Sequence, residues 1–281
     1  MTERLDRVLQ TLRLEQVDTD TYRAGSLPMP HGRVFGGQVL AHAPPAPAAT
    51  VPDDRLPDSV PGFFLGPGDA AGPSPCAVGG PREGRSFTAR RTHALQHGAP
   101  ILSMISSFQL DQPGVVHTSA APRVPPPDTL PASHDTLAPV DHPMATFWGR
   151  YGAFDVRHVE QDLYLAPGPE RTDVQHVWMR ARGPLGDDQV LHHALLAFAC
   201  DQVVLEPVLR RHAASWATPG LAAASLDHAM WWHRPARADE WLLYVQGSPS
   251  AQGGRGLGTA SVFDTAGRLV ATIAQEGMVR L

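Results

Sequence analysis

Lysine is absent from this chain of 281 residues, and all 23 basic residues are arginine. Alanine, proline and glycine are abundant, so we attribute the missing lysine to codon bias in a GC-rich gene and assign it no function. The net charge is −5 and the calculated isoelectric point is about 6.2. Nucleic-acid-binding domains carry a clustered basic surface, so we expect no nucleic-acid partner.

Cysteine and long apolar runs are also scarce. Cys76 and Cys200 lie far apart without metal-like spacing, so we expect no disulfide framework, no zinc site and no cofactor. No stretch approaches the ~18 apolar residues of a membrane span. Residues 1–10 lack the apolar run of a signal peptide, and residues 278–281 are not a peroxisomal address. We therefore expect a cytoplasmic protein.

What the chain does have is the length for two ordinary domains and the composition of a globular protein, with 42% hydrophobic and 18% charged residues. Near the start, Leu5, Val8, Leu9 and Leu12 recur at helical spacing and predict a short amphipathic helix. Residues 32–41, Gly-Arg-Val-Phe-Gly-Gly-Gln-Val-Leu-Ala, predict a glycine turn that leads into a helix. Strands are expected near residues 21–24, 62–65, 86–95 and 101–110.

Prolines separate this region from the rest of the chain. They stand at positions 113, 122, 125, 126, 127, 131, 139 and 143. Proline fits neither a sheet interior nor a regular helix, so this stretch is interpreted as an extended linker. The predicted organisation is an N-terminal domain at residues 1–112, a proline-rich linker at 113–145 and a C-terminal domain at 146–281.

The second half repeats the order of the first. A long apolar helix is predicted from about Val190 to His212. Residues 63–67, Phe-Phe-Leu-Gly-Pro, resemble residues 231–235, Trp-Trp-His-Arg-Pro, as aromatic strands that end at proline. A turn-helix unit followed by antiparallel strands, present twice, predicts an α+β fold in which the strands wrap the helix. Strands are expected near residues 156–165, 174–182, 223–232, 241–246, 256–263 and 269–279.

Four segments carry a resemblance to a known family. They are residues 34–39 (Val-Phe-Gly-Gly-Gln-Val), 82–87 (Arg-Glu-Gly-Arg-Ser-Phe), 225–235 (Ser-Leu-Asp-His-Ala-Met-Trp-Trp-His-Arg-Pro) and 275–277 (Gln-Glu-Gly). In order and separation they resemble the TesB-type (type II) acyl-CoA thioesterases over nearly the whole chain. The resemblance implies two tandem hotdog folds, each a long helix wrapped by an antiparallel β-sheet. It also implies hydrolysis of fatty acyl-CoA to free fatty acid and CoA, and association into a homo-oligomer.

The resemblance also implies which residues act in catalysis. In that family an Asp in the second hotdog helix, a Thr or Ser, and a Gln jointly hold the attacking water. These roles fall on Asp201, Ser225 and Gln275 of this sequence.

The same three residues have chemical interpretations of their own. Asp201 lies between the apolar segments 195–200 and 203–205, and a carboxylate buried there must be hydrogen-bonded or neutralised. Such a group suits a general base, although a helix cap is the plainer alternative. Ser225 is either a strand-edge hydroxyl or a partner of the water. It is not expected to be a nucleophile, because the chain has no Gly-x-Ser-x-Gly. Gln275 either faces solvent or points inward and orients the water.

Other candidates are weaker. His228 is expected to pack or to hydrogen-bond within its strand. Residues 192–193 and His233 lack the spacing of a metal site. The arginines at 90–91 and Arg255 could meet CoA phosphates, but a solvated strand face is the plainer interpretation.

The first half departs from the family pattern through prolines and glycines at residues 44–47, 61–66 and 79–81. An interior proline costs a helix about 3 kcal/mol or more, so the helix after Gly37 is predicted to end or kink near Ala43. Single-base changes relate Ala to Pro codons and Arg to Gly codons, so sequence error is an alternative hypothesis. An intact-mass measurement that matches the sequence would remove it.

Two other functions are open at this point. One is a non-catalytic acyl-CoA-binding double hotdog that has lost turnover through its altered first half. The other is a hotdog enoyl-CoA hydratase. A hydratase needs a His–Asp pair across the site, which the sequential residues Asp227 and His228 do not obviously provide.

Overall fold

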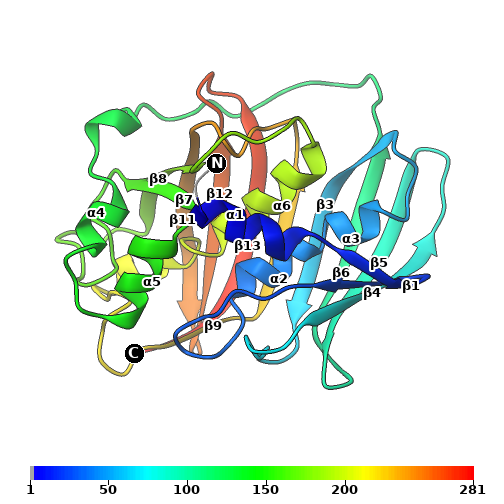
Figure 1. The fold of residues 1–281 in the computed structure, drawn as a ribbon. Helices are drawn as coiled ribbons and strands as arrows, with labels where there is room; N and C mark the ends of the chain where they lie inside the picture. The colour runs from blue at the N-terminus through cyan, green and yellow to red at the C-terminus, as the bar shows by residue number, and fades with distance from the viewer. Residues whose placement is uncertain (1–2) are drawn as a thin grey trace.

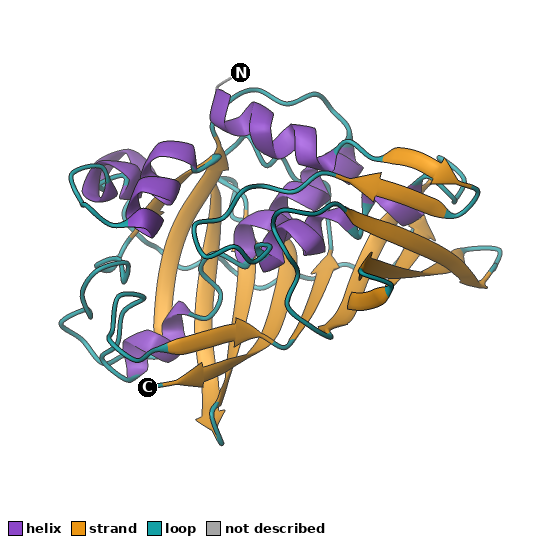
Figure 2. Cartoon of the chain, turned by 60° about the horizontal axis from the view of Figure 1, so that its bottom comes forward, coloured by secondary structure: helices purple, strands orange, loops and turns teal. Residues whose placement is uncertain are grey.

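The computed structural model describes residues 3–281, apart from the side chains of residues 150 and 151. Its strands form one antiparallel sheet that curves around helices packed on one face (Figure 1, Figure 2). The α+β prediction is thus confirmed. The N-terminal half contributes α1 (Glu3–Leu12), β1 (Glu15–Asp18), β2 (Thr21–Ala24), α2 (Gly36–His42), α3 (Pro45–Ala48), β3 (Arg55–Phe64), β4 (Ser74–Arg82), β5 (Phe87–Gln96) and β6 (Ala99–Leu110).

The C-terminal half has the same order of elements with one additional short strand, β9. Short helices precede it: η1 (Pro127–Thr129), α4 (Ser133–Leu137) and α5 (Pro143–Tyr151). It then contributes β7 (Phe154–His158), β8 (Val174–Ala181), α6 (Gln189–Cys200), α7 (Glu206–Arg211), β9 (Ala222–Ser225), β10 (Asp227–Trp232), β11 (Leu242–Gln252), β12 (Arg255–Phe263) and β13 (Leu269–Arg280).

Strands β3 and β10 join the two halves edge to edge. The strand order is β1-β2-β4-β5-β6-β3-β10-β13-β12-β11-β8-β7, and β9 pairs with β13. At the centre of the β3–β10 pairing, Pro61 lies opposite Ala229. Phe63 and Trp231 each lie two positions beyond this pair along their own strands. A pseudo-twofold axis through the central pair therefore exchanges the two aromatic segments that resemble each other in sequence.

The first of the two central helices is interrupted by prolines. Helix α2 ends at His42, and Ala43 and Pro44 keep helical backbone angles up to the start of α3. Prolines have no N–H to donate, so the regular hydrogen bonding of the helix fails here. The prediction that this helix ends or kinks near Ala43 is confirmed.

The second central helix is also shorter than predicted. The single helix expected over residues 190–212 is wrong, because α6 ends at Cys200 and α7 begins at Glu206. The N–H groups of Val203 and Val204 both donate to the Cys200 carbonyl, at 3.1 and 3.0 Å. Pro207 explains the break: inside a continuous helix its ring would clash with a carbonyl one turn earlier, whereas the first turn of α7 tolerates it.

The strand predicted over residues 223–232 is likewise two strands. Leu226 separates β9 from β10. Its N–H donates to the Glu276 carbonyl and its own carbonyl accepts from the Phe64 N–H, both at 2.9 Å. Ser225 therefore lies at the end of β9, beside the junction of the two halves.

The proline-rich stretch is only partly extended. Residues 111–126 form neither helix nor strand, whereas η1, α4 and α5 follow within the next 25 residues or so. The C-terminal half holds this segment: Arg157 Nη1 donates to the Pro127 carbonyl at 2.8 Å, and Trp178 Nε1 donates to the Pro125 carbonyl at 3.0 Å. The domain boundaries given above stay predictions. Among residues 3–281, no helix has the length and apolar character to cross a membrane.

Candidate active site

Asp201 is the C-cap residue of α6. The helix residues that precede it, from His192 to Cys200, are all buried, whereas Asp201 itself is half-buried. The flanking sequence predicts a carboxylate inside an apolar helix. The structure instead places Asp201 at the end of that helix. The break before α7 is what exposes it.

The three predicted site residues lie together. Ser225 Oγ donates to Asp201 Oδ1 at 2.9 Å. Gln275 Nε2 donates to the same oxygen at 2.7 Å and to Ser225 Oγ at 2.9 Å. Gln275 is fully buried, which rules out the solvent-facing alternative. A carboxylate, a hydroxyl and an amide from α6, β9 and β13 therefore form one closed hydrogen-bonded triangle.

The other carboxylate oxygen faces the N-terminal half. A Cβ atom added to Gly36, the first residue of α2, would lie only 2.7 Å from Asp201 Oδ2 and 3.3 Å from the Phe64 ring. Oδ1 accepts two hydrogen bonds from residues of the C-terminal half, whereas Oδ2 points towards Gly36 of the N-terminal half. The site is therefore built by both halves of the chain.

The Phe-Gly-Gly-Gln segment owes its composition to this close approach. A Cβ atom on Gly37 would lie 2.5 Å from the Phe198 carbonyl of α6, so α2 and α6 meet where no side chain fits. Gln38, next in the chain, fixes the preceding loop: its Oε1 accepts from the Leu27 N–H at 2.8 Å and its Nε2 donates to the Gly25 carbonyl at 3.0 Å. These contacts position the start of α2 over Asp201.

His228 also touches the triangle, which the sequence did not reveal. Its Nδ1 lies 2.7 Å from Gln275 Oε1, and its Nε2 lies 3.8 Å from Cys200 Sγ. His228 was expected to pack or to hydrogen-bond within its own strand. It is packed, but its 2.7 Å partner, Gln275, lies on the neighbouring strand β13. The ring is buried, and this burial lowers the pKa of His228 below its ordinary value, so the imidazole is neutral near pH 7.

The N-terminal half has different residues at the corresponding place. The pseudo-twofold axis exchanges Met104 of β6 with Ile273 of β13 and, two positions on, Ser106 with Gln275. The Ser106 hydroxyl is buried without a hydrogen-bond partner. Opposite Ser106 lies Arg90, which is buried rather than solvated. An arginine and an unpaired hydroxyl thus occupy the position where the other half has its amide.

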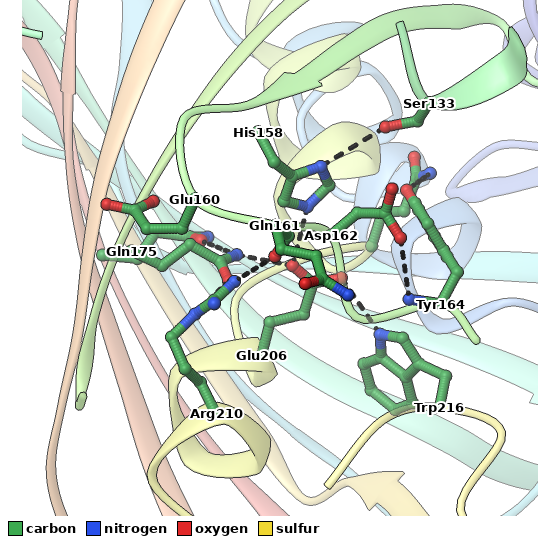
Figure 3. A network of polar contacts seen from close by, with 12 residues as sticks. Ser133, His158, Glu160, Gln161, Asp162, Tyr164, Gln175, Glu206, Arg210 and Trp216 are labelled. Atoms are coloured by element: carbon green, nitrogen blue, oxygen red, sulfur yellow. Dashed lines mark hydrogen bonds and ion pairs between the residues drawn. The ribbon is translucent and has the colours of Figure 1, made fainter. Parts of the chain in front are cut away.

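A second network of buried hydrogen bonds includes Glu206, the first residue of α7 (Figure 3). Ser133 Oγ lies 3.3 Å from His158 Nδ1, and His158 Nε2 lies 2.9 Å from Glu206 Oε2. This serine–histidine–glutamate order was not foreseen from the sequence. Glu206 also accepts from Gln175 Nε2 and Trp216 Nε1, and serine, histidine and glutamate are all buried. With its polar groups paired and its hydroxyl buried, the network attaches α4 to α7 and does not present a nucleophile.

The remaining candidates do not form sites. His193 stacks on Trp232 with ring centroids 4.7 Å apart, and burial lowers its pKa to about 3. His192 bonds to the Gly186 carbonyl through Nε2, at 2.9 Å. Within residues 3–281, no three His, Cys, Asp or Glu side chains gather as metal ligands would. Arg255 pairs with Glu276 at 3.1 Å. Both cysteines are buried free thiols.

A cavity of about 470 Å³ lies between α1, residues 27–30 and α5. Val8, Leu27 and Phe147 line it, and Arg4 and Arg7 stand among its polar wall residues. None of the triangle residues lines this cavity.

The chain is similar to known proteins over nearly its whole length. The model of the acyl-CoA thioesterase N-terminal domain matches residues 25–109, and that of the C-terminal domain matches residues 127–279. Acyl-CoA thioesterase 2 of Haemophilus influenzae is 32% identical, covering 100% of this chain and 99% of its own length. Human acyl-coenzyme A thioesterase 8 is 35% identical, covering 98% of this chain and 89% of its own.

A solved structure extends the likeness to three dimensions. The acyl-CoA thioesterase II TesB2 of Mycobacterium marinum superimposes with a TM-score of 0.82 at 41% identity, covering 97% of this chain and 98% of its own. The predicted pair of hotdog folds is confirmed by this match and by a hotdog-fold protein of Alicyclobacillus acidocaldarius, with a TM-score of 0.77 at 20% identity. The chain therefore belongs to the TesB-type acyl-CoA thioesterase family and is a thioester hydrolase.

Proposed function

We propose that the protein hydrolyses fatty acyl-CoA to free fatty acid and CoA by direct attack of a water molecule that Asp201 deprotonates. The observation that carries the proposal is the unequal use of the two carboxylate oxygens. Oδ1 accepts from both Ser225 and Gln275, whereas Oδ2 faces Gly36 of the other half. Oδ2 is therefore the oxygen with lone pairs left to take a proton.

The hydroxyl of Ser225 assists by holding the water. It donates to Asp201 and accepts from Gln275, which leaves one lone pair for a further donor. A water beside it gives one hydrogen to Ser225 Oγ and the other to Asp201 Oδ2. This pair of contacts aims the oxygen of the water at the thioester carbonyl carbon.

The reaction then follows from ordinary acyl transfer. The water oxygen bonds to the carbonyl carbon as its proton passes to Asp201, and the carbon–sulfur bond breaks as the tetrahedral intermediate collapses. The thiolate of CoA leaves and takes up the proton that Asp201 carries. The developing oxyanion needs donors, and we assign this role to first-turn N–H groups of α2, which begins at Gly36 and has no side-chain cap.

The two rival functions fit this geometry less well. The prolines at residues 44–47 interrupt the helix after His42, at the opposite end of α2 from Gly36, so they leave the triangle intact. This disfavours a protein that binds acyl-CoA without turnover. A hydratase would need His228 to face Asp201, but its two nitrogens face Gln275 and Cys200.

The test combines thiol release with mass analysis. Decanoyl-CoA is incubated with the protein, and free CoA thiol is followed by a thiol-reactive dye. We expect multiple turnovers of thiol release and, after acid quench, an intact mass without an acyl adduct. Binding of decanoyl-CoA with no thiol release would favour the binding protein. An acyl adduct on the protein would overturn the direct attack by water.

A further inference from the structure

The amide of Gln275 works in one orientation only. A carboxylate can accept hydrogen bonds but not donate them, so the NH2 group must face Asp201. Both hydrogens are then used, one on Asp201 Oδ1 and one on Ser225 Oγ. The reverse orientation would place the amide oxygen against the carboxylate. Something must therefore hold the amide oxygen on the opposite side.

His228 meets the amide oxygen at that side. It lies on β10, one position from the Ala229–Ala274 pair, and Gln275 lies one position from the same pair on β13. The 2.7 Å contact between His228 Nδ1 and Gln275 Oε1 requires a hydrogen on Nδ1, because the amide oxygen only accepts. The fully buried ring has no freedom to offer another atom.

We propose that His228 is a positioning residue for the hydrolysis: its Nδ1–H holds the oxygen of Gln275 and so fixes the amide with both N–H groups on Asp201 and Ser225. This inference rests on the proposed function. His228 meets the water and the substrate only through Gln275. Its loss is therefore expected to lower kcat while KM stays nearly unchanged.

Two replacements separate this role from packing. In His228→Asn, Nδ2 is bonded to Cγ just as Nδ1 is in histidine, so a donor remains at nearly the same place. In His228→Leu, a side chain of similar reach has no donor. We expect the Leu variant to lose about 10- to 100-fold in kcat with KM changed less than about twofold, and the Asn variant to recover to within about threefold of the parent. Equal losses in both variants, or a fully active Leu variant, would overturn the proposal.

A double replacement tests whether the effect passes through Gln275. In a Gln275→Ala background, His228→Leu is expected to change kcat by less than about twofold, because the group it positions is gone. Independent losses that multiply would contradict the positioning role. If Gln275→Ala alone keeps full activity, the proposed mechanism fails. If Gln275→Ala is impaired and His228→Leu is not, the mechanism stands and the role of His228 falls.

A spectroscopic measurement does not depend on any leucine variant folding. Nitrogen NMR of the parent protein, with His228→Asn used to assign the resonance, reports which ring nitrogen carries the hydrogen. We expect the neutral ring to be protonated on Nδ1, the less common form in water. A resonance from the form protonated on Nε2 would overturn the proposal.

Discussion

Replacing Asp201 with asparagine separates the charge of this side chain from its place in the hydrogen-bonded triangle. The asparagine Oδ1 can still accept from Ser225 Oγ and Gln275 Nε2. In the parent protein these atoms lie 2.9 and 2.7 Å from Asp201 Oδ1. Its NH2 group replaces Oδ2 beside Gly36, and an amide cannot take a proton from water near neutral pH. The change therefore removes the base and leaves the geometry.

Asp201→Asn is expected to change the activation free energy more than the free energy of unfolding. Losing a general base lowers the rate by about 100- to 10,000-fold, which is about 3 to 5.5 kcal/mol in activation free energy. The two hydrogen bonds become neutral and each weakens by about 1 kcal/mol, while relief of the desolvated charge acts in the opposite direction. The free energy of unfolding should therefore change by less than about 2 kcal/mol, which a folded domain tolerates.

The assay is thiol release from decanoyl-CoA, with thermal unfolding measured on the same samples. Asp54→Asn serves as the matched control, because the Asp54 side chain is 63% exposed and lies in the other half of the chain. We expect the control to match the parent in kcat. A folded Asp201→Asn protein that keeps kcat within about tenfold of the parent would refute the reasoning, because no base effect is that small.

Three further outcomes follow from the described contacts. Ser225→Ala should lower kcat by about 10- to 100-fold, and Ser225→Thr, which keeps the hydroxyl, should recover most of it in the same assay. Gly36→Ala should lower kcat at least about tenfold by crowding the carboxylate, whereas Gly66→Ala, with open space around it, should be neutral. Burial lowers the pKa of His42 from 6.5 to about 4. The unfolded chain thus binds the extra proton first, and stability falls as pH drops from about 6.5 to about 4, by about 3 kcal/mol. His42→Gln, which keeps a donor for the Thr11 carbonyl, should flatten this decline in denaturant unfolding.

Local patterns were enough to predict the break after α2 and the places of most strands, but not the break after α6 or the division between β9 and β10. The prolines after His42 predict the end of α2, because a missing N–H acts within one helical turn. Pro207 carried the same signal for α6, but the apolar run on both sides of it concealed the break. The strand through residue 226 divides for a reason that sequence does not show: Leu226 bonds to two different neighbouring strands.

The residues of the site could be assigned from the sequence, but the contacts between them could not. Asp201, Ser225 and Gln275 were assigned through the family resemblance, and their contact was not derivable from spacing. The bond from His228 to Gln275 depends on the register of β10 against β13, and the link from Ser133 to His158 crosses 25 residues of linker and strand. Contacts of this kind arise from tertiary packing, which the pattern of single segments does not encode.

The pairing of β3 with β10 makes the chain a tethered dimer of two hotdogs. The tether keeps the partner edges at an effective concentration of about millimolar, so they are not left open to another molecule. Because Gly36 comes from one hotdog and Asp201 from the other, the proposed reaction uses residues of both halves. Fusion also lets the two halves carry different residues at equivalent positions. The C-terminal half carries Asp201, whereas the N-terminal half has Ser106, with Arg90 opposite it, at the position related to Gln275 by the pseudo-twofold axis, and still supplies Gly36.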